Sequence, residues 1–203
     1  MNIERPRVEL LTCTPNACYT IEACGRESYG SPISNDEAGN YKWIKARIAG
    51  WEHDVLEHAS ATFVIVCSRV VSHELVRHRI ASYTQQSMRF REVQETDLCM
   101  IPDFVKDEDV EQWYNHYMCA FEVFRWWRER GYNKDQARYH LPLGSSTRIA
   151  CTWNFREIRH IIEMRTPKRA NAEIRKIAKE IRDICIESWP AVFDEYKEEE
   201  DAS

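Results

Sequence analysis

A strand-like run that passes directly into a helical pattern constrains the fold of this chain more than any other feature. Residues 59–66 are mainly apolar and rich in β-branched side chains, which is typical of a strand buried in a sheet. Immediately downstream, Val71, Leu75 and His78 recur at the spacing of one helical face, so we expect a helix over 68–79 that turns His78 inward. The chain must therefore combine strands with helices.

A second periodic segment, residues 110–130, predicts a long helix for which Gly131 provides the C-terminal cap. Its apolar stripe is strongly aromatic and consists of Val110, Trp113, Tyr114, Tyr117, Met118, Phe121, Phe124 and Trp127. Such a stripe could serve as a platform for stacking bases. At helical spacing it more often packs into a core or a subunit interface, and we favour that interpretation.

The other elements are shorter. We expect strands over 8–13 and 87–93, a helix over 18–28 and a turn-rich loop over 31–39. The domain extends over residues 1–193, and the acidic tail, 194–203, is expected to be disordered.

Two helices are expected near the C-terminus. Asn154 and Glu157 form a capping-box pattern that begins the first of them. Thr166-Pro167 is expected to begin the second. The apolar stripe of this second helix consists of Ile174, Ile177, Ala178, Ile181 and Cys185.

Composition and charge exclude several classes of protein. Of the 203 residues, 43% are hydrophobic and 30% are charged, as in ordinary globular proteins. No apolar run approaches the roughly 20 residues of a membrane helix, and the first ten residues lack the apolar core of a secretory signal. We expect a soluble cytoplasmic protein. The net charge of −5 argues against a nucleic-acid-binding module, which usually shows a broad basic footprint.

The chain has eight cysteines, and none forms a Cys-x-x-Cys pair. They lie in segments that resemble helices or strands, so we expect free thiols that are mostly buried. Closely spaced ligand pairs are missing, and no metal site is expected.

Arginine is concentrated in one part of this acidic chain. Five arginines and a single acid, Glu74, lie between residues 69 and 91. A basic run is usually a solvated face. Here, however, Arg77 and Arg79 flank the inward-facing His78, and the guanidinium group is well matched to phosphate oxygens. The pattern favours an anionic ligand.

Arg77-His78-Arg79, followed after seven residues by Ser87, resembles the signature of the flavin-dependent thymidylate synthases. The segment "VLEHASATFVI" (55–65) resembles the block that precedes this signature in the family. The segment "QARYHLPLGSSTRIACTWNFREIRHIIEMR" (136–165) resembles the block that follows it, and "ANAEIRKIA" (170–178) resembles the closing helix. The resemblance covers nearly the whole chain, from about Val8 to about Trp189.

This resemblance implies one α+β domain with a mostly antiparallel sheet packed with long helices, assembled as a homotetramer with shared sites. It also implies reductive methylation of dUMP to dTMP, with FAD as cofactor and methylenetetrahydrofolate and NADPH as co-substrates. The cofactor would carry the redox step and the protein the positioning. The alternatives are a related flavoenzyme that modifies another pyrimidine nucleotide and, less favoured by charge, a nucleic-acid-binding module.

The family's binding residues can be matched to positions of this sequence. Flavin contacts are implied for Asp54, Arg77, His78, Arg79, Gln85, Asn154, Phe155, Arg156 and His160. Contacts to the nucleotide and its phosphate are implied for Glu74, Arg77, Gln85, Gln86, Ser87, Met88, Arg89, Arg138 and Arg165. We expect Ser87 to donate a hydrogen bond rather than to act as a nucleophile, because no Ser-His-acid spacing accompanies it.

Arg165 is the expected catalytic residue. Helical periodicity places it on the apolar face of Ile158, Ile161 and Ile162, where an unpaired charge would be very costly. A structural salt bridge or a frayed helix end is one explanation. The resemblance implies another, in which Arg165 contacts the pyrimidine and favours loss of the ring proton between the two carbonyls.

Two departures from the family pattern affect the expected site. Asp54 stands where the family commonly has a hydroxyl near the flavin phosphates, and Met88 and Phe90 flank Arg89 where other side chains are common. These differences concern fine specificity rather than the overall assignment.

Overall fold

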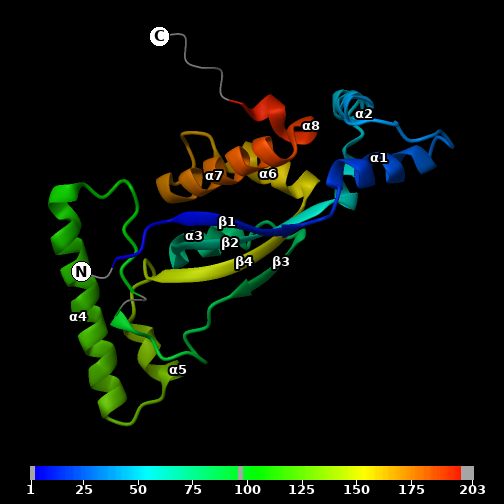
Figure 1. Ribbon diagram of the computed structural model, residues 1–203. Coiled ribbons are helices and arrows are strands. Elements are labelled where there is room, and N and C mark those ends of the chain that lie inside the picture. Colours follow the sequence, from blue (N-terminus) through cyan, green and yellow to red (C-terminus); the bar gives the residue numbers. More distant parts are fainter. Residues whose placement is uncertain (1–2, 96–97, 198–203) are drawn as a thin grey trace.

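A four-stranded antiparallel sheet forms the centre of the computed structural model, which describes residues 3–95 and 98–197 (Figure 1). The strands are β1 (Arg7–Cys13), β2 (Ser60–Ser68), β3 (Ala81–Gln85) and β4 (Ser146–Asn154), and they lie in the order β1-β2-β4-β3. The pairing of β2 with β4 runs without interruption from Ser60 opposite Asn154 to Ser68 opposite Ser146. The expected α+β fold with an antiparallel sheet is confirmed.

The sheet buries one face. From β2, Phe63, Ile65 and Cys67 point into the main core, where they meet Cys151 and Trp153 of β4. On the opposite face, Thr62 and Thr152 bond to each other through their hydroxyls at 2.9 Å. This alternation is typical of an antiparallel sheet whose helices pack on one side. It is incomplete in β2, because Val64 and Val66 on the opposite face are buried as well.

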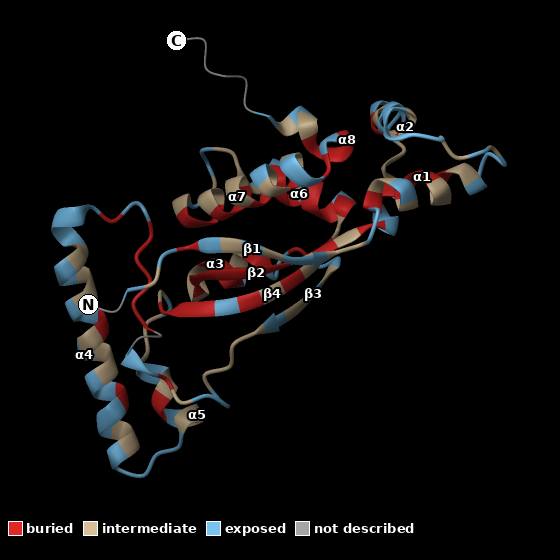
Figure 2. Ribbon diagram, viewed as in Figure 1, coloured by how far each residue is buried: buried red, intermediate tan, exposed pale blue. Residues whose placement is uncertain are grey.

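Three helices cover the apolar face of the sheet: α6 (Phe155–Arg165), α7 (Ala172–Ser188) and α8 (Pro190–Phe193). Figure 2 shows the buried residues gathered in the strands and along the sides of these helices that face them. The predicted stripes of α6 and α7 are all buried. Asn154 caps α6 as expected, because its side chain accepts a hydrogen bond from the backbone N–H of Glu157.

The expected start of α7 was wrong. The helix begins at Ala172 rather than near Thr166-Pro167, because Asn171 caps it by accepting from the backbone N–H of Glu173. Thr166 belongs to the end of α6, where its hydroxyl donates to the carbonyl of Ile162 at 2.7 Å.

Two helices at one end of the sheet belong to the N-terminal part of the chain, α1 (Ala17–Glu27) and α2 (Glu37–Ala49) (Figure 1). Helix α2 was not expected. It begins inside the predicted loop 31–39, where Asp36 accepts a hydrogen bond from the backbone N–H of Gly39 and so caps the helix. A 3-10 segment, η1 (His53–His58), leads from α2 to β2.

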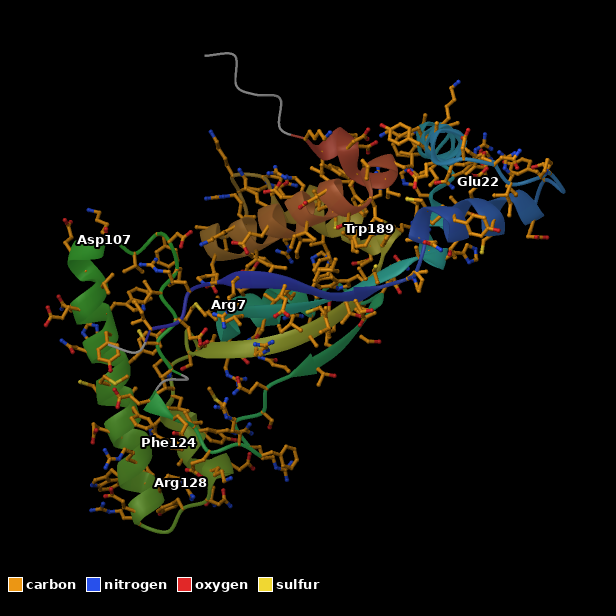
Figure 3. The ribbon with its side chains drawn as sticks, in the orientation of Figure 1. Arg7, Glu22, Asp107, Phe124, Arg128 and Trp189 are labelled. Carbon is orange, nitrogen blue, oxygen red and sulfur yellow. The ribbon has the colours of Figure 1, made fainter. Side chains whose placement is uncertain are left out.

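A second, smaller core surrounds α4 (Val110–Glu129), which is followed by α5 (Lys134–Ala137). The predicted helix over 110–130 is confirmed, and Gly131 just beyond it has a φ of 88°, a conformation that glycine adopts without strain. Phe124 of this core and Trp189 of the main core are both labelled in Figure 3. Part of the aromatic stripe stays accessible, since only Tyr117 and Phe124 of α4 are buried.

The predictions around the arginine-rich segment needed correction. Helix α3 (Arg69–Leu75) ends earlier than the expected 68–79, and residues 88–90 form a turn where a strand over 87–93 was expected. The strand of this segment is β3, six residues earlier. Tyr83 of β3 explains the early end of the helix, because its hydroxyl lies 2.7 Å from the carbonyl oxygens of both Leu75 and His78. His78 nevertheless remains buried.

Only the beginning of the expected tail can be described. Asp194–Tyr196 form a 3-10 turn, η5, in which Asp194 contacts Lys45 and Glu195 contacts Arg159. The rest of the tail, from residue 198, lies outside the described residues. No described helix is long and apolar enough to cross a membrane.

All eight cysteines lie in the described part of the chain and are free, as expected. Cys67, Cys99, Cys151 and Cys185 are buried, and Cys119 is exposed. Burial raises the pKa of Cys99 to about 11 and that of Cys151 to about 12. Thiols in this state are poor nucleophiles at neutral pH.

The hydroxyl of Tyr83 offers a test of this arrangement. Besides its two carbonyl contacts, it accepts a hydrogen bond from Nε1 of the fully buried Trp153 at 3.0 Å. Tyr83→Phe leaves these groups without their partner, so we expect the free energy of unfolding to fall by about 1–3 kcal/mol. Urea unfolding measures the change. Tyr139→Phe is the control because Tyr139 is 83% exposed, and an equally small effect of both changes would contradict the proposed contact network.

Candidate functional site

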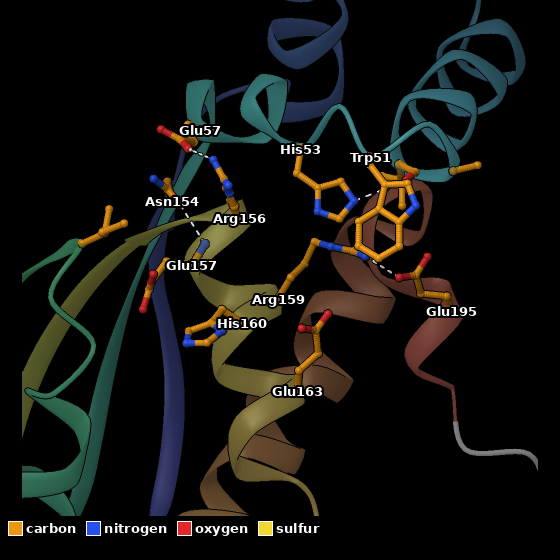
Figure 4. A pocket seen from close by; sticks show the side chains of 13 residues that line it. Trp51, His53, Glu57, Asn154, Arg156, Glu157, Arg159, His160, Glu163 and Glu195 are labelled. Carbon is orange, nitrogen blue, oxygen red and sulfur yellow. Dashed lines mark hydrogen bonds and ion pairs between the residues drawn. The ribbon is translucent and has the colours of Figure 1, made fainter.

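A cleft of about 890 Å³ opens between the residues that follow α2, the segment η1 and the first turns of α6 (Figure 4). Its walls carry Ile48, Ala49, Trp51, His53, Glu57, Ile80, Asn154, Arg156, Glu157, Arg159, His160, Glu163 and Glu195. A volume of this size is typical of sites that enclose a cofactor or a drug-sized molecule.

The cations inside the cleft are already paired. Arg156 Nη1 lies 2.6 Å from Glu57 Oε1, and the buried Arg159 donates to the carbonyl of Val192 and to Glu195. These contacts join α6 to η1 on one side and to the C-terminal segment on the other. The two arginines therefore hold the walls of the cleft in place before any ligand binds.

A chain of polar side chains lies beside the cleft. Arg165 Nε donates to Nε2 of His78 at 3.2 Å, and His78 Nδ1 lies 3.1 Å from Glu157 Oε1. Arg165 Nη1 also pairs with Glu74 Oε2 of α3 at 2.9 Å. We call Glu74, Arg165, His78 and Glu157 the polar relay; His78 and Glu157 are buried, and Glu74 and Arg165 are half-buried. It connects α3 to α6 through the signature histidine.

The contacts of His78 determine its protonation state. The guanidinium of Arg165 can only donate, so Nε2 of His78 must be the acceptor. The single ring proton then lies on Nδ1 and is donated to the carboxylate of Glu157. Burial lowers the pKa of His78, and the positive charge of Arg165 acts in the same direction, while Glu157 opposes it. His78 is thus a neutral imidazole at neutral pH.

The exposed His160, which lines the cleft, completes a cluster with His78 and Glu157. Its ring lies edge-on to His78 with the two centroids 5.6 Å apart. His78, Glu157 and His160 offer ligand atoms within 4.8 Å of one another, which is close enough for a metal ion. Both ring nitrogens of His78 are already hydrogen bonded, so metal binding would have to break at least one bond of the polar relay.

An aromatic pair, the exposed Trp51 and the half-buried His53, forms part of the cleft wall. Trp51 is 85% exposed and lies in the left-handed region, with a φ of 63°. Its ring is stacked on His53, with centroids 5.7 Å apart, and His53 Nε2 lies 3.2 Å from the carbonyl oxygen of Ile48. The pair presents a flat surface at the mouth of the cleft (Figure 4).

Arg77 and Arg79 differ from the arginines inside the cleft. Both are exposed and flank His78, and Arg79 directly precedes Ile80, which lines the cleft. Among residues 3–95 and 98–197, neither is paired with an acid. These two guanidinium groups are free to meet an anionic ligand.

The remaining signature residues form a second group, which begins with Gln85, the last residue of β3. Gln85 Nε2 donates to Ser72 Oγ at 2.9 Å and to Thr147 Oγ1 at 3.1 Å, and Arg69 donates to the carbonyl of Gln86. Burial and the nearby charge of Arg138 lower the pKa of Arg69. Two guanidinium groups therefore lie close together here.

Ser87 is placed in this second group by a turn. Its Oγ accepts from the backbone N–H of Arg89 at 3.1 Å, while Arg89 itself is exposed. Arg138 pairs with Asp135 at 2.7 Å, and Met88 packs against the core of α4. The group collects the predicted nucleotide-binding residues Gln85, Gln86, Ser87 and Met88 in one short segment.

Of the predicted flavin contacts, Asn154, Arg156 and His160 line the cleft, whereas the others do not: Asp54, Arg77, His78, Arg79, Gln85 and Phe155. The side chain of Phe155 is fully buried against Trp189 and Phe193, so only its backbone could contact a ligand. Asp54 is exposed on η1 and does not line the cleft.

Sequence reasoning did not assign Trp51, His53 or Glu157 to the site. Only Glu157 gave a signal, as the fourth residue of the capping-box pattern, but its carboxylate points to His78. Trp51 and His53 lie in a connection whose path depends on the tertiary fold.

Comparison with known proteins identifies the family of this chain. The profile of the family described as "Thymidylate synthase complementing protein" matches residues 9–191. A flavin-dependent thymidylate synthase from Thermococcus kodakarensis is 41% identical over 186 residues, which cover 85% of this chain and 75% of that protein. The chain belongs to the flavin-dependent thymidylate synthase family.

Other members of the family and a solved structure extend the comparison. The enzyme of the same name from Thermococcus onnurineus is 44% identical over 141 residues, or 65% of this chain and 57% of that protein. The fold matches that of PolB, a UMP/dUMP methylase from Streptomyces cacaoi bound with 5-Br dUMP, with a TM-score of 0.83 at 20% identity and 97% coverage of each chain. The family match thus rests on sequence, and the structural likeness supports the fold.

The backbone of Trp51 generates a prediction that can be tested without any ligand. In the left-handed region a side chain costs roughly 1–2 kcal/mol that glycine avoids. We expect Trp51→Gly to be more stable than Trp51→Ala by about 1 kcal/mol, as measured by thermal unfolding. At the helical, exposed control position Tyr19 the order should reverse, with Ala more stable than Gly. If the Ala variant is more stable than the Gly variant at both positions, the backbone of Trp51 is not strained.

Proposed function

We propose that this protein catalyses the reductive methylation of dUMP to dTMP, with FAD as cofactor and methylenetetrahydrofolate and NADPH as co-substrates. The observation that carries the proposal is the bond between His78 of the signature and Arg165 of the second family block, beside a cleft of suitable size. Residues 87 positions apart are thereby joined at one site.

The residues around the cleft fit a flavin dinucleotide. Arg77 and Arg79 are exposed beside the cleft-lining Ile80 and pair with no acid in the described part of the chain, so they can supply positive charge for a diphosphate. Asn154, Arg156 and His160 supply polar groups on the wall of the cleft. When bound, FAD would supply the hydride that reduces the transferred one-carbon unit. The chain supplies orientation and exclusion of water, as proteins generally do for such cofactors.

The second group of residues, around the Ser87 turn, fits a nucleoside monophosphate. Arg69, Arg89 and Arg138 lie around the Ser87 turn, so several guanidinium donors can serve phosphate oxygens there. The amide of Gln85 is held by Ser72 and Thr147, which fixes its position before any nucleotide binds. In this proposal the phosphate lies near Ser87 and the pyrimidine extends toward Arg165.

Arg165 would activate the pyrimidine electrostatically. Its Nη atoms contact Glu74 in this structure, and its Nε is held by neutral His78. A guanidinium held from two sides can stabilise negative charge that develops on a ring edge with little reorganisation. No covalent nucleophile is needed, which agrees with the raised thiol pKa values. Among the residues described, no cysteine lines the cleft.

Assembly as a homotetramer with sites shared between subunits, and a cytoplasmic location, are further parts of this proposal. The accessible aromatic residues of α4 and the uncovered face of the sheet are surfaces compatible with assembly. The related candidate is methylation of another pyrimidine nucleotide, for which UMP is the substrate to compare with dUMP. A nucleic-acid-binding role is not proposed, because the net charge is −5.

The flavin part of the proposal can be tested through the exposed arginines. We expect Arg77→Gln with Arg79→Gln to weaken FAD binding by roughly 10- to 10²-fold, the scale of one or two lost charged hydrogen bonds. The melting temperature should stay unchanged, because neither side chain is buried. Flavin absorbance after gel filtration and calorimetric titration measure the loss. Arg148→Gln, on the uncovered face of the sheet, is the control. Normal FAD affinity in the double variant would contradict this assignment.

The role of Arg165 can be tested by Arg165→Lys. Lysine can keep the ion pair with Glu74 but lacks the planar fork, so we expect turnover to fall by roughly 10²-fold or more. Tritium release from labelled dUMP, with labelled UMP alongside, measures the reaction and its substrate preference. Flavin content and thermal stability should change little. Arg175→Lys on α7 is the control. Near-normal turnover of the Arg165 variant would assign Arg165 to structural ion pairing alone.

A further inference from the structure

Glu157 occupies an unusual place on α6. Sequence pattern suggests a capping-box acid, and its backbone N–H does donate to Asn154 Oδ1 at 2.8 Å. Its carboxylate, however, is buried and lies 3.1 Å from His78 Nδ1. A carboxylate that is taken out of water needs a partner, and His78 Nδ1–H supplies it.

His78 is held on every polar atom. Its backbone N–H donates to the carbonyl of Leu75 at 3.0 Å, and its own carbonyl accepts from the Tyr83 hydroxyl at 2.7 Å. The ring nitrogens contact Glu157 and Arg165. The backbone contacts fix where the imidazole lies, but they do not determine which ring nitrogen carries the proton.

Only one of the two neutral tautomers of His78 can accept the hydrogen bond from Arg165. With the proton on Nδ1, the lone pair of Nε2 accepts from Arg165 Nε. With the proton on Nε2, two N–H groups would face each other and the bond to Arg165 would be lost. The charged groups around the ring are Glu157 and Arg165 of α6, with His160 beside them and Glu74 of α3 behind Arg165. Among these groups, only Glu157 is an acceptor that contacts Nδ1.

We propose that Glu157 is a positioning residue, which selects the Nδ1–H tautomer of His78 and thereby holds Arg165 in its working orientation. Glu157 acts through His78 and touches neither Arg165 nor the pyrimidine. This inference rests on the proposed function for its effect on turnover, but the tautomer itself is a property of the protein without ligands.

The first test therefore needs no activity. Histidine labelled with ¹⁵N distinguishes protonated from unprotonated ring nitrogens by NMR, and His78→Gln identifies the signals of His78 among the seven histidines. We expect the native protein to show Nδ1–H. Glu157→Ala should lose this preference, and Glu157→Gln should largely keep it, because the amide oxygen still accepts. A native His78 with its proton on Nε2, or an unchanged tautomer in Glu157→Ala, would overturn the proposal.

The second test measures turnover. We expect kcat to fall by roughly 10- to 10²-fold in Glu157→Ala, the scale of a misplaced catalytic group, with a smaller change in KM for dUMP and substantial recovery in Glu157→Gln. Glu22→Gln is the matched control, because Glu22 is likewise a buried, hydrogen-bonded acid but lies on α1. It should lower stability without changing the His78 signals.

These tests separate the two proposals. If the native protein shows the Nδ1–H tautomer and Glu157→Ala loses it, but the native protein does not methylate dUMP, the proposed function fails while the selection of the tautomer by Glu157 stands. If the native enzyme is active and Glu157→Ala has normal kcat, the positioning role fails alone. If Glu157→Ala does not fold, the native and Glu157→Gln spectra decide the tautomer.

Discussion

The uninterrupted pairing of β2 with β4 is the constraint on which the rest of the structure depends. At one end of this ladder Ser60 lies opposite Asn154, so η1, which precedes β2, and α6, which follows β4, must lie side by side. The cleft lies between them. At the other end Ser68 lies opposite Ser146, which brings the start of α3 to the segment before β4. A shift by one residue would turn Phe63 and Trp153 out of the core and separate both pairs.

The hydrophobic pattern of the sequence predicted much of the framework, because apolar residues recur wherever one face of a helix or strand is buried. The stripes of α6 and α7, the long helix α4 and the strand β2 all carry such a pattern, and their existence was predicted from it. Strand β4 was missed as a strand although Ile149, Cys151 and Trp153 alternate along it. Helix α2 was missed because only Ile44 and Ile48 are buried in it and a glycine lies in its first turn.

The site was predicted residue by residue from family motifs, and its connections were not. The contact of Arg165 with His78 joins residues 87 positions apart, and that of His78 with Glu157 joins residues 79 apart. Such pairs depend on how strands register and where Tyr83 ends the turn after α3. No periodicity in a single sequence contains that information. For the same reason, the sequence does not distinguish arginines that pair with an acid, such as Arg156 and Arg159, from Arg77 and Arg79, which pair with no acid among the described residues.

The placement of the thiols has a consequence for how this protein responds to its chemical surroundings. Oxidants and alkylating reagents attack the thiolate, and burial raises the pKa of Cys18 to about 11 and that of Cys151 to about 12, which keeps these sulfurs protonated. Of the eight cysteines, all within the described residues, Cys119 on α4 alone is exposed. The buried thiols are therefore protected from oxidants, while the exposed Cys119 offers an attachment point for a spectroscopic label.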